Sequence, residues 1–316
     1  MPTSPASAQR RAFLSSLAGA GLMAAAPLAA SAAPAQPAAP FVPKLGQHGK
    51  DVIWLPTPEP LIKRLLTMAG LGPRDTLVDL GSGDGAIVIS AARDFGAKAH
   101  GVEYDARMVE LSRHNAAQEK VSDKTSFEQG DLYATDFSRF DVVAMYLLPQ
   151  MNVQLRHKLM AMKPGTRIVT HQFHLGAWEP DETTLISYRP GYLWIVPARA
   201  AGRWALTIEG EPDTIELSLE QSFQRLEGHA TLQALQTTLR SPRLLGKQIH
   251  FAYTDQSGFL REFSGWINGE QIHGSVSGPR GNVPFTARLL EAATVAGTEP
   301  ATEDEINAAI VSLGGH

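Results

Sequence analysis

Apolar and polar positions alternate in two different ways along the chain, and the pattern changes near residue 200. From about residue 52 to residue 196, short apolar runs alternate with helix-like segments. The apolar runs predict strands at residues 76–80, 100–103, 126–128, 141–146 and 167–171. The segments between them predict helices over residues 86–95, after Asp105, and over residues 150–162, the last stopped by Pro164-Gly165. Residues 184–188 and 192–196 predict a closing antiparallel pair. This order predicts an α/β fold with a mainly parallel sheet.

After Arg203 the chain shows short alternating segments without a convincing helix, down to about residue 290. The clearest unit is a hairpin of residues 263–267 and 270–274, in which Asn268-Gly269 predicts a type I′ turn. About seven strands over about 90 residues predict a second, all-β domain that is a small barrel or sandwich. A short amphipathic helix is predicted over residues 303–313.

The first 32 residues have the pattern of an export leader. Arg10-Arg11 precede Ala12-Phe13-Leu14, an Ala/Gly/Leu run and the small residues Ala30-Ser31-Ala32. They resemble a twin-arginine signal, which predicts recognition by the twin-arginine export machinery, cleavage after Ala32 and a periplasmic location. An uncleaved leader would anchor the protein in the membrane, but the run is Ala-rich and broken by Pro27, so we expect no stable membrane span in the mature form.

These patterns predict five regions along the chain. They are the leader (residues 1–32), an Ala/Pro linker (33–44), an α/β domain (45–200), a β domain (203–290) and a C-terminal tail (291–316).

Composition narrows the possible functions. The 316-residue chain has a net charge of −4, and the leader contributes two arginines and no acid, so the remainder is more acidic still. This balance argues against a nucleic-acid partner, which needs a basic surface. The chain has no cysteine, which excludes disulfides and a cysteine nucleophile.

A glycine-rich loop follows the first predicted strand and opens a helix. Its sequence, Gly81-Ser82-Gly83-Asp84-Gly85, allows a tight turn and lets a ligand approach the amides at the helix N-terminus. Because Gly81, Gly83 and Ala86 also satisfy the dinucleotide spacing G-x-G-x-x-A, the loop alone leaves a nicotinamide or flavin enzyme open.

Three acids at successive strand ends distinguish these cofactors. Asp79, two residues before the first glycine, would repel the phosphates of a dinucleotide and attract the ammonium of S-adenosylmethionine. Glu103 is placed to accept the ribose hydroxyls, a feature that NAD enzymes share. Asp131 is placed to accept the adenine amino group, with Leu132 beside the ring. Together they favour S-adenosylmethionine over NAD.

Residues 52–198 resemble the class I, Rossmann-like S-adenosylmethionine-dependent methyltransferases. Within that class they are similar to the mitochondrial lysine methyltransferases that modify the ATP synthase c-subunit and adenine nucleotide translocase. The resemblance rests on the segments 54–58 (WLPTP), 77–85 (LVDLGSGDG) with 87–89 (IVI), 112–113 (SR), 131–132 (DL) and 148–151 (LPQM). It implies a methyltransferase fold, and a loop at Thr57 that closes over the methionine end of the cofactor. The β domain and the leader have no counterpart in this resemblance.

The acceptor side of the site is predicted at the ends of the fourth and fifth strands. An amine nucleophile must be neutral when it attacks, and acceptors there can orient it. Tyr146 and His171 are the candidate catalytic residues, although packing is the plainer interpretation of Tyr146. His174 alternates with His171 around the chain, so both are not expected to face one pocket. Without clustered acids beside these histidines, we predict no metal site.

We therefore expect a methyltransferase that transfers a methyl group from S-adenosylmethionine to a protein amine, such as lysine, or to a small molecule. The alternative is a non-catalytic exported binding or scaffold protein that retains the fold. A relic would not need to keep Asp79, Glu103 and Asp131 together, so the intact acids favour the enzyme. A nicotinamide oxidoreductase is disfavoured by Asp79.

Overall fold

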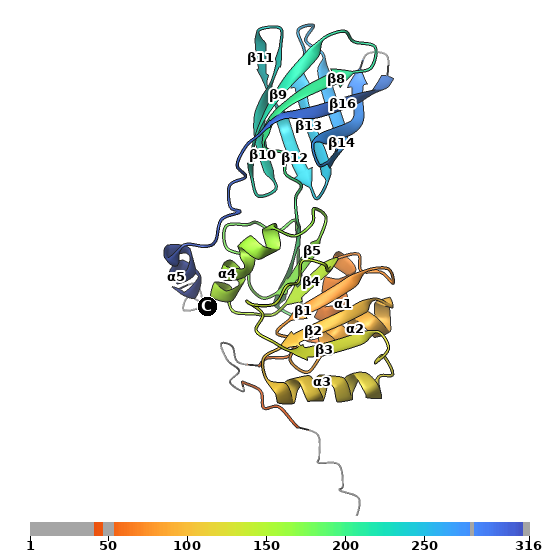
Figure 1. Ribbon diagram of the computed structural model, residues 1–316, viewed down its shortest axis with the longest axis vertical. Coiled ribbons are helices and arrows are strands. Elements are labelled where there is room, and N and C mark those ends of the chain that lie inside the picture. The colour runs from red at the N-terminus through yellow and green to blue at the C-terminus, as the bar shows by residue number, and fades with distance from the viewer. Residues whose placement is uncertain (1–40, 47–53, 279–280, 312–316) are drawn as a thin grey trace, which may run out of the picture. The chain divides into compact units, whose positions relative to one another are not determined.

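A seven-stranded sheet forms the first half of the computed structural model, which describes residues 41–46, 54–278 and 281–311. The strand order is β3-β2-β1-β4-β5-β7-β6 (Figure 1). The strands are β1 (Thr76–Leu80), β2 (Lys98–Glu103), β3 (Thr125–Gln129), β4 (Val142–Met145), β5 (Arg167–His171), β6 (Glu182–Ile186) and β7 (Arg189–Ile195). Strands β1 to β5 pair in parallel, whereas β7 runs antiparallel to both of its neighbours, β5 and β6. The predicted α/β class and the closing antiparallel pair are confirmed. The predicted leader lies outside the described residues.

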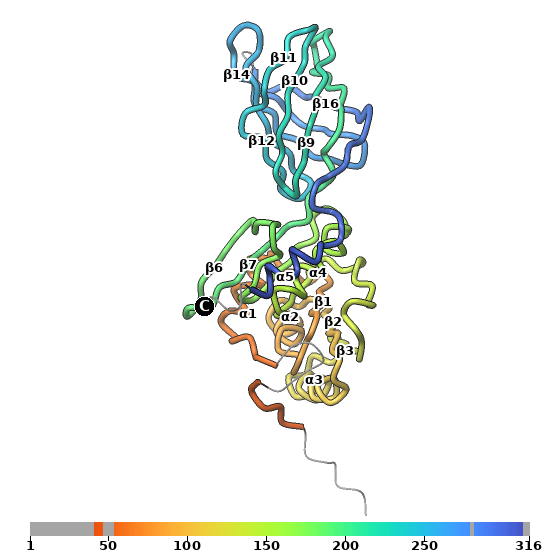
Figure 2. Tube along the Cα trace, turned by 90° about the vertical axis from the view of Figure 1, so that its left-hand side faces the viewer, coloured from red at the N-terminus to blue at the C-terminus, as the bar shows by residue number. Residues whose placement is uncertain are grey.

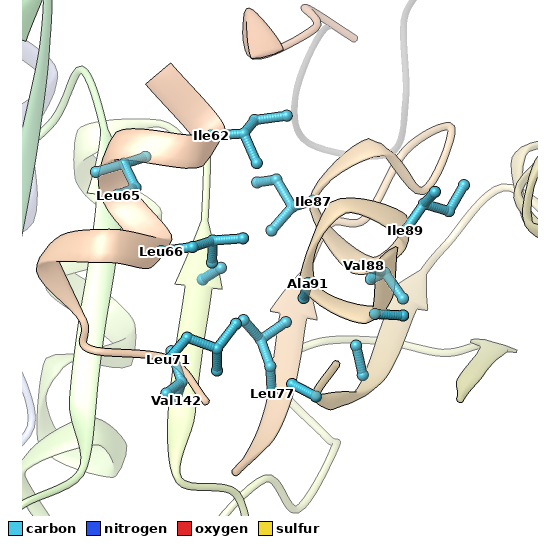
Figure 3. Close-up of a cluster of buried hydrophobic side chains, with 14 of the residues drawn as sticks. Ile62, Leu65, Leu66, Leu71, Leu77, Ile87, Val88, Ile89, Ala91 and Val142 are labelled. Atoms are coloured by element: carbon cyan, nitrogen blue, oxygen red, sulfur yellow. The ribbon is translucent and has the colours of Figure 1, made fainter. Parts of the chain in front are cut away.

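Alternate residues of the central strands face two separate cores. Leu77 and Val142 are buried with the apolar residues of α1 (Glu59–Met68) and α2 (Ala86–Phe95), as Figure 3 shows. Their neighbours Val78 and Val143 point to the other face, where they pack with α4 (Pro149–Met160). Helix α3 (Ala106–Gln118) contributes Val109 and Ala116 to the first core. Because strand side chains alternate in direction, near-continuous apolar strands are what a sheet covered on both faces requires.

Several predicted bounds agree with the structure. The helix over residues 86–95 and the strand over residues 167–171 have the predicted limits, and Asp105 caps α3 by accepting a hydrogen bond from the Arg107 amide at 2.9 Å. Helix α4 ends two residues earlier than predicted, at Met160. The sequence analysis missed α1, which begins after Pro58 and buries Leu61, Ile62, Leu65 and Leu66.

The second half of the chain is a closed antiparallel barrel, so the barrel alternative of the predicted β domain is correct. Its strands are β8 (Gly202–Ile208), β9 (Thr214–Ser222), β10 (Arg225–Leu232), β11 (Leu235–Thr238), β12 (Arg240–Leu245), β13 (Gln248–Thr254), β14 (Leu260–Asn268), β15 (Gln271–Gly278) and β16 (Gly281–Ala292). The sheet order is β11-β10-β12-β13-β14-β15-β16-β8-β9, and a further pairing of β9 with β10 closes it. Strand β11 extends β10 outside this ring. The described part of this domain has nine strands, compared with about seven predicted.

The turn of the predicted hairpin differs from the prediction. Asn268 pairs with Gln271, so Gly269 and Glu270 form the two-residue turn. Gly269 has a φ of 61°, and neither Asn268 nor Glu270 has a positive φ. A positive φ at the first turn position alone is typical of type II′, so the type I′ prediction was wrong by one residue of register.

The C-terminal helix α5 (Glu303–Val311) returns to α4, and both views show the two side by side (Figures 1 and 2). Arg156 of α4 is only 3% exposed, and its Nη2 donates a hydrogen bond to Glu305 Oε1 at 2.7 Å. The same guanidinium lies 5.6 Å from the ring centre of Phe223, which also stacks on Trp178 at 6.0 Å. A buried cation of the first half of the chain therefore depends on a carboxylate from the tail.

Among the described residues, no helix is both long enough and apolar enough to cross a membrane.

Candidate cofactor and acceptor site

A pocket of about 1020 Å³ opens at the carboxyl ends of β1 and β4. The strand order reverses between these strands, and ligands of open α/β sheets bind at such a switch point. All of the predicted cofactor residues line this pocket: Thr57, Asp79, Gly81, Gly83, Glu103, Asp131 and Leu132. The structure thus brings together side chains and glycines that lie up to 75 positions apart in the sequence.

The glycine loop has a backbone conformation that side chains rarely adopt. Gly81 and Gly83 have φ angles of 80° and 54°. A Cβ at Gly83 would lie 2.9 Å from Nε1 of Trp54, which lines the same pocket. Position 83 therefore requires glycine, because its φ is positive and because the indole of Trp54 lies so close.

Backbone amides hold Glu103 at the pocket wall. Gly83 N–H donates to Oε2 at 2.9 Å, and Asp105 N–H donates to Oε1 at 3.0 Å. Each carboxylate oxygen keeps acceptor capacity for a ligand hydroxyl. Asp131 is oriented in a similar way, because its Oδ1 accepts the Tyr133 amide at 2.9 Å. Both acids are fixed in place by the main chain, as ligand-binding groups must be.

Asp79 is the most deeply buried acid of the site, with 2% of its surface exposed. Burial raises the pKa of Asp79 well above its ordinary value, and the negative charges of Glu103 and Asp84 raise it further. A cation beside this carboxylate would relieve both effects.

The charge of the pocket fits S-adenosylmethionine. Five carboxylates belong to its described lining, namely Asp79, Asp84, Glu103, Asp105 and Asp131, and no Lys, Arg or His does. S-adenosylmethionine carries a sulfonium and an ammonium, so the electrostatics favour it, whereas the two phosphates of a dinucleotide would be repelled.

The two candidate catalytic residues lie in contact beside the pocket. Tyr146 lines it, and its ring centre is 3.9 Å from that of His171. His171 is 1% exposed, and its Nδ1 is 3.1 Å from the hydroxyl of Thr57. Burial, with a smaller contribution from the charge of Arg189, lowers the pKa of His171 to about 4, so its ring is neutral near pH 7.

His171 does not belong to the described lining of the pocket. Its Nε2 is buried and has no hydrogen-bond partner among the described residues. His174 lies elsewhere, 4.1 Å from the ring centre of Tyr192, so the expectation that the two histidines diverge is confirmed.

Several lining residues were missed by the sequence analysis. Trp54 and Tyr104 line the pocket, and so do Asp84 and Asp105. Their signals were available, since Asp84 lies within the glycine loop and Tyr104-Asp105 follows directly on Glu103. The position of Trp54 over Gly83 depends on tertiary packing, which no local pattern indicates.

The strand order, the glycine loop at the switch point and the acid-lined pocket define a class I S-adenosylmethionine-dependent methyltransferase. Residues 79–182 match the ANTKMT methyltransferase domain. A protein-lysine N-methyltransferase of Saccharolobus islandicus is 39% identical over 133 residues, which are 42% of this chain and 83% of that protein. The chain belongs to the methyltransferase family that contains this enzyme.

Two further matches cover different shares of the proteins concerned. The ATP synthase c-subunit lysine N-methyltransferase of Mus musculus is 38% identical over 35% of this chain and 45% of its own. A crystal structure of an RNA methyltransferase from Salinibacter ruber in complex with S-adenosyl-L-homocysteine is 44% identical over 46% of this chain and 95% of its own, with a TM-score of 0.45. The family match ends before the barrel, and it favours the enzyme over a non-catalytic scaffold.

Proposed function

We propose that this protein methylates the side-chain amine of a protein lysine. The observation that carries the proposal is the match to a protein-lysine N-methyltransferase over 83% of that enzyme's length. The geometry agrees with an amine acceptor, because the pocket opens beside Tyr146 and the neutral ring of His171.

S-adenosylmethionine, when bound, supplies an electrophilic methyl group on a sulfonium. The chain's own residues bind and orient the reactants and exclude water. Asp79 would hold the ammonium of the cofactor, Glu103 its ribose hydroxyls and Asp131 its adenine, and Tyr146 would form the wall on the acceptor side. His171 lies behind this wall, where its ring packs on Tyr146 and its Nδ1 is hydrogen-bonded with the Thr57 hydroxyl, so it positions two residues that line the pocket. Because the pKa of His171 is about 4, its ring is a weak base near neutral pH, so we assign it a positioning role rather than removal of a proton from the amine.

The test is methylation of candidate proteins with S-adenosylmethionine labelled on the methyl group with ¹³C and deuterium. Proteins extracted from the native host would be incubated with the full chain, digested and searched by mass spectrometry for labelled lysine. Two controls are the Asp79→Asn variant and an extract whose amines have been acetylated beforehand. Labelled lysine that disappears in both controls supports the proposal. Label found only on small molecules, or only on other side chains, contradicts it.

We further propose that the leader directs twin-arginine export to the periplasm. The support is the sequence pattern around Arg10-Arg11, which lies outside the described residues. Replacing both arginines by lysine keeps the charge, and full-length precursor should then accumulate in the cytoplasm. Processed protein still found outside the cytoplasm by fractionation would disprove this route.

A further inference from the structure

A large aromatic side chain faces solvent on the outer wall of the barrel. Trp266 of β14 is 56% exposed, whereas Trp178, Trp194 and Trp204 are fully buried. Along β14, residues alternate between the barrel interior and solvent, and Trp266 holds a solvent-facing position. Leaving an indole in water costs free energy that burial would recover, so such a residue is a candidate for ligand contact.

Trp266 borders a hollow of about 1080 Å³ over strands β12 to β15. The cross-strand register explains the hollow: Trp266 pairs with Gln248 and His273, and the next outward row along the strands is His250, Ser264 and Ser275. Because two serines stand beside the much larger indole, the surface is depressed between Trp266 and the strand that carries Arg243.

Aromatic rings pack the interior of the barrel as far as the structure describes it. Phe251 and Phe263 stack at 4.7 Å, and Phe285 meets Phe263 edge to face at 5.2 Å. These three rings are at most 2% exposed and fill the core. The Trp266 hollow, by contrast, lies on the outside of the barrel, where a ligand has room.

The polar groups of the hollow are donors and hydroxyls, with one permanent positive charge. Arg243 has no ion-pair or hydrogen-bond partner for its guanidinium within the part of the chain that the structure describes. His250 Nδ1 lies 3.1 Å from the Ser264 hydroxyl, and Gln248 adds an amide. The described lining includes no carboxylate, and Glu262, two residues before Ser264, is not part of it. The charge is complementary to an anion that also carries hydroxyl groups.

We propose that this hollow binds a carboxylate-bearing sugar chain, such as a polyuronate. A sugar ring has an apolar C–H face that stacks on an indole and a rim of hydroxyls that pair with Ser, Gln and His side chains. Arg243 would hold the carboxylate. A peptide strand is disfavoured, because β13 and β14 are paired on both sides and leave no edge to extend.

The experiment is affinity electrophoresis of the full chain in native gels that contain polygalacturonate, neutral dextran or dextran sulfate. We expect polygalacturonate to retard the wild type and to quench its exposed-tryptophan fluorescence. Trp266→Ala should weaken the apparent affinity by about tenfold or more, and Arg243→Gln by a similar factor. Tyr188→Ala is the matched control, since Tyr188 is 95% exposed outside the barrel and its loss should change nothing.

Three results would overturn the proposal. The first is no retardation of the wild type by polygalacturonate. The second is equal retardation of the wild type and Trp266→Ala, which would mean binding by general charge. The third is stronger retardation in dextran sulfate or neutral dextran than in polygalacturonate. Near-ultraviolet circular dichroism confirms that each variant keeps its folded core, so a loss of binding is not a loss of structure.

Discussion

Burial of the Asp79 carboxylate costs the folded protein free energy, and a bound cationic ligand would reduce that cost. The carboxylate is buried, and neighbouring acids raise its pKa above that in the unfolded chain. A raised pKa means that the folded state binds the proton more tightly, so the stabilisation present at low pH is lost as pH rises through the folded pKa. Burial thus disfavours the ionised form of Asp79 in the free protein, and a cation beside the carboxylate would favour that form.

Asp79→Asn should therefore have opposite effects on stability and binding. We expect a higher melting temperature without ligand, because Asn does not ionise and so avoids the desolvation penalty of a buried carboxylate. Affinity for S-adenosylmethionine should fall by roughly 10- to 100-fold, about 1.5 to 3 kcal/mol. Calorimetric titration and thermal melts of the same preparations measure both effects.

The control is Asp105→Ala, which also removes a pocket carboxylate. Asp105 caps α3 and pairs with Arg107, and the hydrogen bonds from Arg107 lower its pKa. Its loss should lower the melting temperature. If Asp79→Asn also lowers the melting temperature, or binds S-adenosylmethionine as tightly as the wild type, the role assigned to Asp79 is wrong.

His171 should make the protein sensitive to acid. Its pKa falls from an ordinary 6.5 to about 4 in the folded state. The unfolded chain then binds more protons between these values, so stability present above pH 6.5 is lost as pH falls toward 4, by about 3 kcal/mol. Denaturant unfolding at pH 7.5 and pH 4.5 should show a smaller pH effect in His171→Gln than in the wild type. The exposed His114→Gln should match the wild type, and an equal pH effect in all three proteins would count against this account.

At the scale of single residues, the sequence was sufficient to predict the acids of the pocket but not the side chains that contact the other site residues. Asp79, Glu103 and Asp131 follow from strand ends and loop spacing, because the carboxyl ends of parallel strands meet at one edge. The contact between Thr57 and His171 joins residues 114 positions apart, and the burial of Arg156 depends on a helix near the C-terminus. Those contacts require the assembled fold.

At the scale of secondary-structure elements, the ion pair that joins α4 and α5 can be tested directly. Arg156 has Glu305 as its counter-ion, while its Nε and Nη1 have no hydrogen-bond partner among the described residues. Glu305→Gln leaves that charge buried without compensation and should reduce the free energy of unfolding by about 3 kcal/mol. Chemical denaturation measures the change.

Glu303→Gln is the matched control on the same helix, and it should have little effect because Glu303 is exposed. The double variant Arg156→Met with Glu305→Gln should recover most of the loss, since an apolar side chain suits the site. A loss in Glu305→Gln no larger than that in Glu303→Gln would show that the ion pair contributes little.

The sequence predicted an element correctly where its boundary residues gave a strong local signal. It was wrong or incomplete where tertiary packing determines the element. Residues 86–95 are bounded by Gly85 and Gly96, both with positive φ, so their helix could be predicted to the residue. Helix α1 was missed because Pro58 and Pro60 at its start are typical of an extended segment as well as of a first turn. The predicted position of the hairpin turn was shifted by one residue, because an Asn-Gly pair is compatible with more than one strand register.

At the scale of the whole molecule, the barrel is an insertion between β7 and α5. Its first and last strands lie beside each other, since Gly202 of β8 pairs with Ala292 of β16. The chain thus enters and leaves the barrel at nearly the same point, and α5 then packs against α4. Cutting the chain at residue 200 removes α5 together with the barrel, whereas an internal deletion can keep α5.

We predict that the two shortened proteins differ. Residues 41–201 joined by a short Gly linker to residues 293–316 keep Glu305, while residues 45–200 alone lose it. Both retain every predicted cofactor residue, and both lose the Phe223 ring that covers Trp178. The deletion should therefore be the more stable by about 3 kcal/mol, and it should bind S-adenosylmethionine. A folded deletion, shown by a cooperative melt, that does not bind would mean that the barrel helps to form the cofactor site.

The late position of Glu305 has a consequence for biosynthesis. The ribosome adds this residue 149 positions after Arg156, once every strand of the barrel has been made. Until then a nascent chain holds an uncompensated cation inside its catalytic half. The final packing of the methyltransferase sheet is therefore expected only after Glu305 has emerged from the ribosome, and a ribosome that stalls within the barrel leaves a product that proteases can distinguish from the finished enzyme.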